Sequence, residues 1–198
     1  MKIAILTFDG FNELDSFIAS GILNRMKERG WDVQITSPSP SVVSMNGVTI
    51  MSQQSLEFAN TADVVLFGSG LLTRDIAKDS HLLSRLNLDP SKQLIGGQCS
   101  GTLLMSVLGL LNGVAACTDL TTKPWVIKSG VEVLNKSFNA QGNIATAGGC
   151  LASQYLATWV IYKLAGKQQA EAAIHYVSPV SEKAQCVNHC INVVEQYI

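Results

Sequence analysis

The stretch that decides the fold is Leu94-Ile95-Gly96-Gly97-Gln98-Cys99-Ser100-Gly101-Thr102-Leu103. It begins as a short apolar run typical of a buried strand and leads into an apolar segment with a helical repeat. Between them, the spacing Gly97-x-Cys99-x-Gly101 is the cysteine form of a nucleophile elbow, a sharp turn from a strand into a helix. The stretch therefore predicts that the Cys99 thiol protrudes at the end of a sheet strand.

A thiol in such a turn has a reactive setting. The backbone N–H groups that follow it and the dipole of the helix favour a thiolate, and the same N–H groups can hold a developing negative charge. The alternative is a buried structural cysteine at an ordinary glycine-rich turn. The strand before Cys99 and the helix after it favour the reactive interpretation.

Apolar runs and helical repeats alternate along the rest of the chain. Strands are expected at residues 2–8, 32–36, 62–67 and 93–97, with weaker ones at 114–117, 131–134 and 144–146, and helices at 15–29, 73–86, 100–111, 151–164 and 168–176. Asn46-Gly47 between two apolar alternations predicts a hairpin with positive φ at both turn positions. The alternation predicts an α/β fold in which helices cover both faces of a mostly parallel sheet.

Composition narrows the class of protein. The chain has 198 residues, of which 47% are hydrophobic and only 15% are charged, and its net charge is −1. These values exclude a disordered chain, and the lack of basic clusters argues against nucleic acid as a partner. No apolar run is long enough for a membrane span and no secretory signal precedes the first strand, so we expect a cytoplasmic protein of one domain, residues 1–198.

The five cysteines form an odd set, which is typical of free thiols in a reducing compartment. Cys186, His189 and Cys190 could ligate a metal, but one short cluster is a weak zinc signal, and a helical tail is the simpler interpretation. We expect no metal and no cofactor.

Four segments together resemble the ThiJ/PfpI superfamily, which is class I glutamine amidotransferase-like, and in particular its isonitrile hydratase branch. They are Ile5-Leu6-Thr7-Phe8-Asp9-Gly10-Phe11 with Glu13-Leu14-Asp15, Asp63 to Phe67 with Gly68-Ser69-Gly70, Gln98-Cys99-Ser100-Gly101 with Gly109-Leu110-Leu111-Asn112-Gly113, and Thr146-Ala147-Gly148-Gly149. The resemblance covers residues 1–179. It implies a flavodoxin-like three-layer sandwich with the nucleophile elbow after a central strand.

The resemblance also implies roles for individual residues. Cys99 would be the nucleophile and Asp15 its acid/base partner, while Ser100 would bind substrate and its amide would form an anion hole with that of Gly70. Asp119, Gly148 and Gly149 would complete the substrate site. The alternatives are that Asp15 and Ser100 are N-caps, since both residue types cap helices well.

The chain departs from its relatives where many of them carry a histidine, because Asp119 stands at that place. Its own histidines, His81, His175 and His189, fall in segments that the family places away from the pocket. A protease-type Cys-His pair is therefore disfavoured. A late Asp of relatives is replaced by Gln154.

The leading hypothesis is a cysteine-dependent hydratase or hydrolase of a small carbon–nitrogen compound, nearest to isonitrile hydratase. The second is a redox or stress-responsive protein with an oxidisable Cys99, and the third is a non-catalytic domain that senses a small molecule. Relatives commonly pair, so the resemblance also implies a homodimer.

Overall fold

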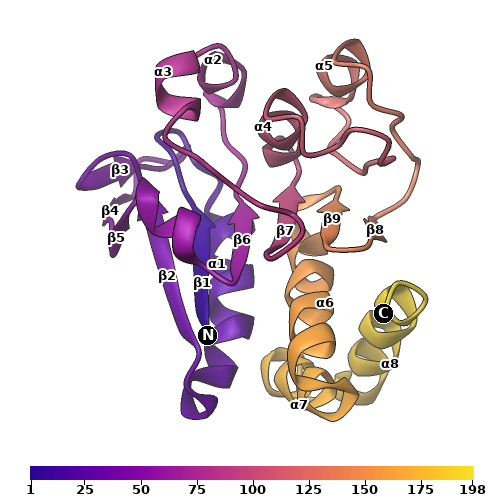
Figure 1. Cartoon of the computed structure of the whole chain (residues 1–198). Helices are drawn as coiled ribbons and strands as arrows, with labels where there is room; N and C mark the ends of the chain where they lie inside the picture. The colour runs from indigo at the N-terminus through magenta and orange to yellow at the C-terminus, as the bar shows by residue number, and fades with distance from the viewer.

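The computed structural model describes all residues from Met1 to Ile198. Its centre is a seven-stranded sheet in the order β5-β2-β1-β6-β7-β9-β8, in which every neighbouring pair is parallel except β8 and β9 (Figure 1). The strands are β1 (Lys2–Leu6), β2 (Asp32–Ser37), β5 (Gln54–Ser55), β6 (Val64–Phe67), β7 (Leu94–Gln98), β8 (Phe138–Gln141) and β9 (Ile144–Ala147). The mostly parallel α/β sheet expected from the sequence is confirmed.

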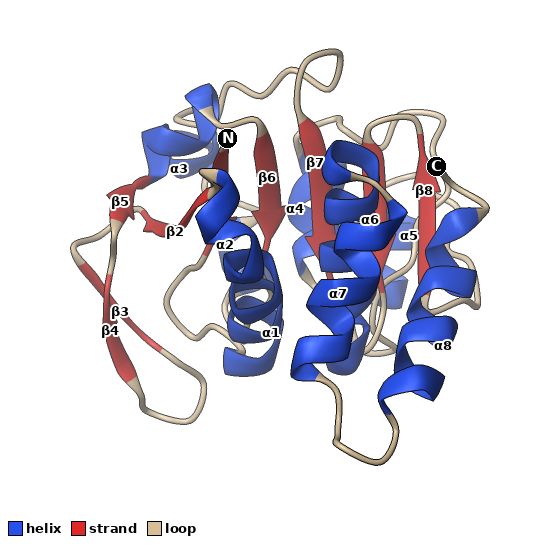
Figure 2. Cartoon of the chain, turned by 90° about the horizontal axis from the view of Figure 1, so that it is seen from below, coloured by secondary structure: helices blue, strands red, loops and turns tan.

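Helices cover both faces of the sheet. One face carries α1 (Glu13–Leu23), α6 (Ser153–Ala165), α7 (Lys167–Val177) and α8 (Lys183–Glu195), and the other carries η2 (Leu56–Thr61), α4 (Gly101–Val107) and α5 (Lys123–Lys128) (Figure 2). The remaining short helices are η1 (Asn24–Arg29), α2 (Thr73–Ile76), α3 (Ser80–Leu83) and η3 (Cys150–Ala152). This is the predicted three-layer arrangement.

The core is divided in two by the sheet. On β1, Ile3 and Ile5 pack into the cluster under α1 and α6, whereas Ala4 and Leu6 pack into the cluster under α4. Successive side chains of a strand point to opposite faces, so a strand covered on both sides must be apolar throughout. This requirement accounts for much of the high hydrophobic share and the low charge of the chain.

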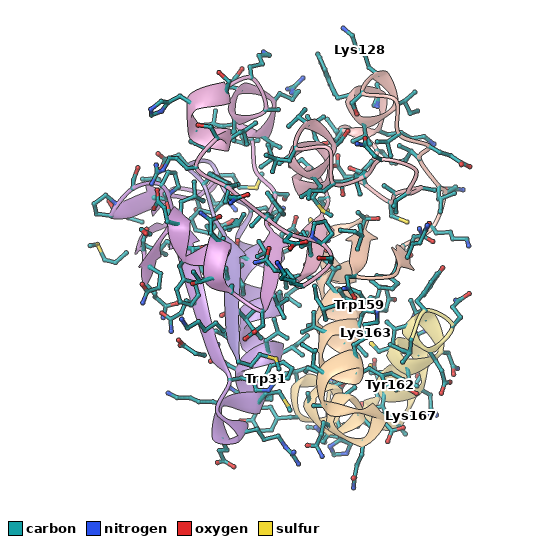
Figure 3. All side chains as sticks on the ribbon, in the orientation of Figure 1. Trp31, Lys128, Trp159, Tyr162, Lys163 and Lys167 are labelled. Atoms are coloured by element: carbon teal, nitrogen blue, oxygen red, sulfur yellow. The ribbon has the colours of Figure 1, made fainter.

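The last helix, α8, makes polar contacts with α6 and α7. Glu195 accepts hydrogen bonds from Tyr162 of α6 and Lys167 of α7, at 3.0 and 2.7 Å. Both donor residues are labelled in Figure 3. His189 shares a 2.8 Å hydrogen bond with the Tyr155 hydroxyl. The expected helical tail is thus a packed helix. None of the helices combines the length and the apolar character required to cross a lipid bilayer.

Several predicted elements are shorter in the structure or are absent. The helix expected over 15–29 ends at Leu23 and continues as η1, the one expected over 73–86 is split into α2 and α3, and the one expected over 100–111 ends at Val107. The strands expected at 114–117 and 131–134 reduce to one bridge between Ala116 and Val133. Apolar periodicity does not locate such breaks, because a loop that packs on the core carries apolar residues too.

The predicted hairpin is present, but its turn is different. β3 (Ser41–Val43) and β4 (Thr49–Met51) pair antiparallel, and the Ser44 N–H donates to the Val48 carbonyl at 2.8 Å. Only Gly47 has a positive φ, 87°, and Asn46 does not. The expectation of positive φ at both positions was wrong because the loop holds three residues between Ser44 and Val48, and such a loop needs one left-handed residue.

Gly101 is required where α4 begins, directly beneath the elbow. A Cβ atom at this position would lie 2.4 Å from the Phe67 carbonyl oxygen and 2.7 Å from that of Gly68. These are backbone atoms of β6 and of the loop after it, so they cannot move away by side-chain rotation. The close approach lets α4 start immediately after Cys99 against the neighbouring strand.

We expect Gly101→Ala to lower the free energy of unfolding by about 1–3 kcal/mol, the usual cost of forcing an extra group into a packed site. The matched control is Gly21→Ala in α1, where a Cβ would meet nothing within 4 Å, and it should raise the free energy of unfolding by about 0.5–1 kcal/mol. Urea unfolding of the three proteins measures both effects. A Gly101→Ala protein as stable as the wild type would contradict the steric argument.

Candidate active site

The candidate site lies where four adjacent parallel strands end. β1, β6, β7 and β9 are neighbours in the sheet, and their carboxyl ends meet at one edge. The chain after β1 leads to Asp15, the chain after β6 to Ser69, β7 leads directly to Cys99, and the chain after β9 leads to Cys150. The carboxyl edge of a parallel sheet is where α/β proteins commonly bind ligands.

Cys99 occupies the predicted elbow. Its φ of 47° is the only positive value outside glycine in the chain, which is a strained conformation for a residue with a side chain. The turn is held by the Cys99 N–H, which donates to the Ala147 carbonyl of β9, and by the Thr118 hydroxyl, which donates to the Cys99 carbonyl, both at 2.8 Å. Only 4% of Cys99 is exposed, and it faces a cavity of about 310 Å³.

Asp15 is 2% exposed and does not itself line this cavity, but it contacts lining residues. It is not the helix cap that the sequence left open, because Asn12 caps α1 by accepting from the Leu14 N–H at 3.1 Å. The Ser69 hydroxyl donates to Oδ2 of Asp15, and Oδ1 is buried without a partner. An oxygen of Asp15 and the sulfur atoms of Cys99 and Cys150 all lie within 4.8 Å of one another.

Burial governs the protonation of this group of residues. It raises the pKa of Asp15 above its ordinary value, against the lowering effect of the Ser69 hydrogen bond. It also raises the pKa of the Cys99 thiol strongly, and the negative charge of Asp15 adds to the rise. The pKa of Cys150 rises for the same two reasons. The resting thiols therefore keep their protons, and a thiolate forms only if a neighbour accepts one.

Ser100 does not cap α4 with its side chain, so that alternative is excluded. Its hydroxyl oxygen accepts from the Gly70 N–H at 3.1 Å and shares a 2.8 Å hydrogen bond with the Thr73 hydroxyl. The Gly70 amide, expected to be free for an anion, is thus already satisfied. The Ser100 N–H makes no hydrogen bond within the protein, so it is open to a ligand.

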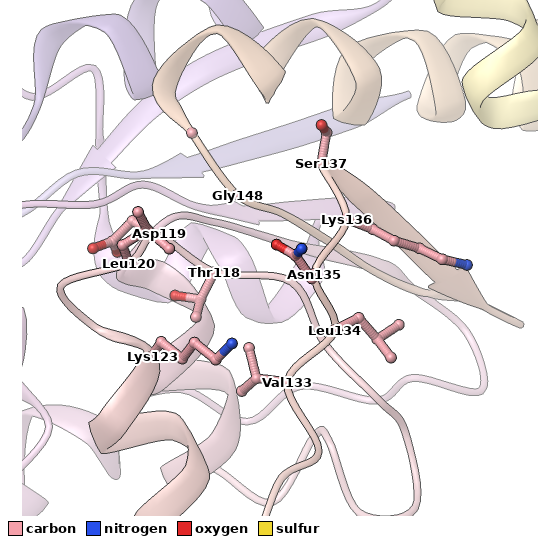
Figure 4. Close-up of a pocket in the computed structure, with 11 residues that line it drawn as sticks. Thr118, Asp119, Leu120, Lys123, Val133, Leu134, Asn135, Lys136, Ser137 and Gly148 are labelled. Atoms are coloured by element: carbon pink, nitrogen blue, oxygen red, sulfur yellow. The ribbon is translucent and has the colours of Figure 1, made fainter.

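Asp119 lies between two cavities. It lines the one beside Cys99, and it also lines a second cavity of about 320 Å³ with Gly148 and Gly149 (Figure 4). One oxygen of Asp119 accepts from the Thr122 N–H at 2.9 Å, and the other is buried without a partner. Its charge raises the pKa of Asp15. Gly148 and Gly149 line the second cavity and not the one beside Cys99, although the Gly149 backbone reaches the Cys99 thiol and acts, against the larger raising effect of burial, to lower its pKa.

The structure adds residues that the sequence did not single out. Cys150 lines the cavity with Cys99, and the Asn12 side-chain amide donates to its sulfur at 3.2 Å. Gln98 donates to the Cys99 sulfur at 3.4 Å and to the Gly149 carbonyl at 2.8 Å. A signal for Cys150 was available, because it directly follows Gly148 and Gly149, which the resemblance placed at the substrate site. None of the three histidines lines this cavity.

The donor atoms of Asp15, Cys99 and Cys150 are close enough together to share a metal ion. That the protein needs no metal stays a prediction.

Comparison with known proteins gives the same assignment as the fold and the elbow. Residues 1–163 match the model of the DJ-1/PfpI family. The chain belongs to this family. Its structure is similar to Drosophila melanogaster DJ-1beta, with a TM-score of 0.78 and 21% identity over 89% of this chain and 96% of that one.

Two other solved structures are similar. A ThiJ/PfpI family protein from Pseudomonas syringae has a TM-score of 0.77 and 18% identity over 98% of this chain and 87% of that one. Schizosaccharomyces pombe DJ-1 has a TM-score of 0.75 and 17% identity over 90% of this chain and 100% of that one. No curated sequence matches the chain. At these identities the likeness shows the fold alone.

The raised pKa of Asp15 has a consequence for stability. The folded chain holds the Asp15 proton more tightly than the unfolded chain, whose carboxyl has its ordinary value of 3.8. The free energy of unfolding that Asp15 contributes therefore falls as the pH rises above that value. We expect the stability of Asp15→Asn, relative to wild type, to increase from acid to neutral pH in urea unfolding.

The control for this experiment is Asp89→Asn. Hydrogen bonds, first from Ser91 and then from Lys92, lower the pKa of the exposed Asp89 carboxyl to about 2. The stability of Asp89→Asn relative to wild type should therefore decrease as the pH rises through the acid range. If the stability of Asp15→Asn relative to wild type is constant or decreases with pH, the pKa of Asp15 is not raised in the folded protein.

Proposed function

We propose that the protein is a cysteine-dependent hydratase or hydrolase of a small carbon–nitrogen compound, close to isonitrile hydratase in its chemistry. The observation that carries the proposal is the proximity of the buried Asp15 carboxyl to the Cys99 thiol, which lines a small cavity. The cavity is lined by hydroxyls and by the open Ser100 amide, which suit a small polar substrate.

The chemistry follows from the two buried groups. Cys99 attacks the terminal carbon of an isonitrile, and its proton passes through Asp15 to that carbon, which gives a thioimidate bound to the sulfur. Asp15, protonated again after this relay, donates its proton to the thioimidate nitrogen, and the resulting carboxylate takes a proton from water, which attacks the same carbon. Cys99 then leaves with its proton restored, and the product is an N-substituted formamide. The sum is the addition of one water to the isonitrile.

The burial of the two groups suits this reaction. Because burial favours the protonated forms of both Asp15 and Cys99, the site does not need to hold a thiolate before substrate arrives. The Ser100 N–H would stabilise negative charge that develops on the substrate. The Gly70 amide could join it only if the Ser100 hydroxyl moved, and Thr73 offers that hydroxyl a second partner.

A second candidate is a redox or stress-responsive protein. It is favoured by the same contact between a sulfur and a carboxyl, since a protonated Asp15 would donate to a sulfinic acid formed on Cys99. Mild peroxide treatment followed by mass spectrometry separates the candidates. In the redox case Cys99 would be oxidised well ahead of Cys117. A ligand that stabilises the protein without being consumed would instead favour a sensing domain.

We also propose that the protein is cytoplasmic and forms a homodimer. All five cysteines are free, as in proteins of a reducing compartment. Exposed apolar side chains gather where Phe11 bridges to Ser44 and Gly70, and they include Leu14, Phe17, Met45, Val48 and Leu71. A second copy that covered this surface would remove it from water.

For the hydratase, we expect Cys99→Ala to abolish conversion of a panel of small isonitriles to formamides. Asp15→Asn should lower kcat by about 10²–10⁴, the usual contribution of a positioned acid/base. Cys186→Ser is the control, because its half-buried thiol lies on α8 away from the cavity. The proposal fails if the wild type converts none of the panel, or if Cys99→Ala converts it unchanged.

For the dimer, we expect Leu14→Arg to shift the protein to monomer in sedimentation equilibrium, because it places a charge in the apolar surface. Val180→Arg is the matched control, since Val180 is exposed between α7 and α8. A wild type that is monomeric at all concentrations would refute the dimer.

A further inference from the structure

Cys150 is a second thiol in the cavity with no part in the reaction described above. Its sulfur lies within 4.8 Å of the Cys99 sulfur, and the two residues follow adjacent strands, β7 and β9. Cys150 is half-buried and lines the cavity, so a small oxidant that enters reaches both sulfur atoms. Cys117, the other buried thiol of this half of the chain, is not among the residues lining this cavity.

We propose that Cys150 is a resolving cysteine, which forms a reversible disulfide with Cys99 when a peroxide oxidises either of them. This inference does not rest on the hydratase proposal, because the bond forms whatever the substrate is.

Each of the two sulfur atoms accepts a hydrogen bond from a side-chain amide. Asn12 donates to the Cys150 sulfur at 3.2 Å, and Gln98 donates to the Cys99 sulfur at 3.4 Å. Both donors are also anchored in the backbone, Asn12 as the cap of α1 and Gln98 on the Gly149 carbonyl. A disulfide needs a sulfur–sulfur distance of about 2.05 Å, so the two sulfur atoms must approach from their present separation of at most 4.8 Å.

The steps balance as a two-electron reduction of the peroxide. One thiol attacks the peroxide oxygen, which breaks the O–O bond and leaves a sulfenic acid and an alcohol or water. The second thiol attacks the sulfenic sulfur, the S–S bond forms, and water leaves with the second thiol's proton. Two molecules of a small thiol such as glutathione restore both cysteines and become oxidised to their own disulfide.

The carboxyl of Asp15 serves both steps. It lies within the same 4.8 Å as the two sulfur atoms, so it can donate its proton to the leaving water and take the proton of the attacking thiol in its place. The disulfide would block the Cys99 sulfur and stop its oxidation before the irreversible sulfinic stage.

The test is limited oxidation of the wild-type protein with hydrogen peroxide, followed by digestion without reduction. Trypsin leaves Cys99 and Cys117 together in residues 93–128, because Lys123 precedes proline, and leaves Cys150 alone in residues 137–163. We expect these peptides to be linked, with fragmentation placing the bond at Cys99. The protein should lose two of its five free thiols and recover both with dithiothreitol.

Variants separate a specific disulfide from general oxidation. Cys99→Ser and Cys150→Ser should each abolish the linked peptides, whereas Cys186→Ser should keep them. In Cys150→Ser, which retains an acceptor for Asn12, Cys99 should instead accumulate sulfinic acid several-fold over wild type. The proposal is overturned if wild-type Cys99 goes to sulfinic acid without the link, if the bond is at Cys117, or if Cys150→Ser leaves the sulfinic yield unchanged.

Discussion

The left-handed backbone of Cys99 is the constraint on which the site depends. A residue with a side chain occupies this conformation only when its surroundings hold it there. Here the Cys99 N–H donates to a carbonyl of β9, and the Cys99 carbonyl accepts from the Thr118 hydroxyl. The hydrogen bond to β9 connects the elbow to the strand that precedes Cys150. The position of the Cys99 sulfur is therefore set by the sheet, and a shift of β9 would move both sulfur atoms.

Burial is the second physical theme of the site. A carboxyl and two thiols lie close together, Asp15 and Cys99 are almost fully buried, and Asp119 adds a second carboxylate, while Arg74 is the one basic side chain that lines the cavity. In such a place the neutral forms are favoured. In some other sites a nearby cation stabilises a thiolate before the substrate binds. Here the reactivity of a thiol would instead depend on proton transfer with the Asp15 carboxyl during the reaction.

The sequence predicts the parts of the structure that local signals determine. The elbow at Cys99 and the buried strands beside it follow from glycine spacing and from apolar runs, which are consequences of sterics and burial at those residues. The antiparallel β8 was not expected, because Phe138–Gln141 is short and only half apolar. The splitting of the helix after Gly70 was missed because its apolar residues pack on the core in either arrangement.

The candidate site is predicted less completely, for a physical reason. Cys99 and Asp15 are brought together as the family pattern implied, but the hydrogen bond from the Gly70 amide to the Ser100 hydroxyl joins positions 30 residues apart. No local pattern encodes such a contact. Cys150 shows the same limit, because its place beside Cys99 follows from the strand order, which sequence periodicity does not give.

Asn12 links two parts of the molecule that are usually independent. Its side-chain oxygen caps α1, and its side-chain nitrogen reaches the sulfur of Cys150, 138 residues away. Helix capping alone would accept Ser or Asp at this position about as well as Asn, but neither carries the second, donating group. Position 12 therefore has a narrower choice of residues than its place at a helix start suggests. Among homologues, its identity is expected to vary together with that of position 150.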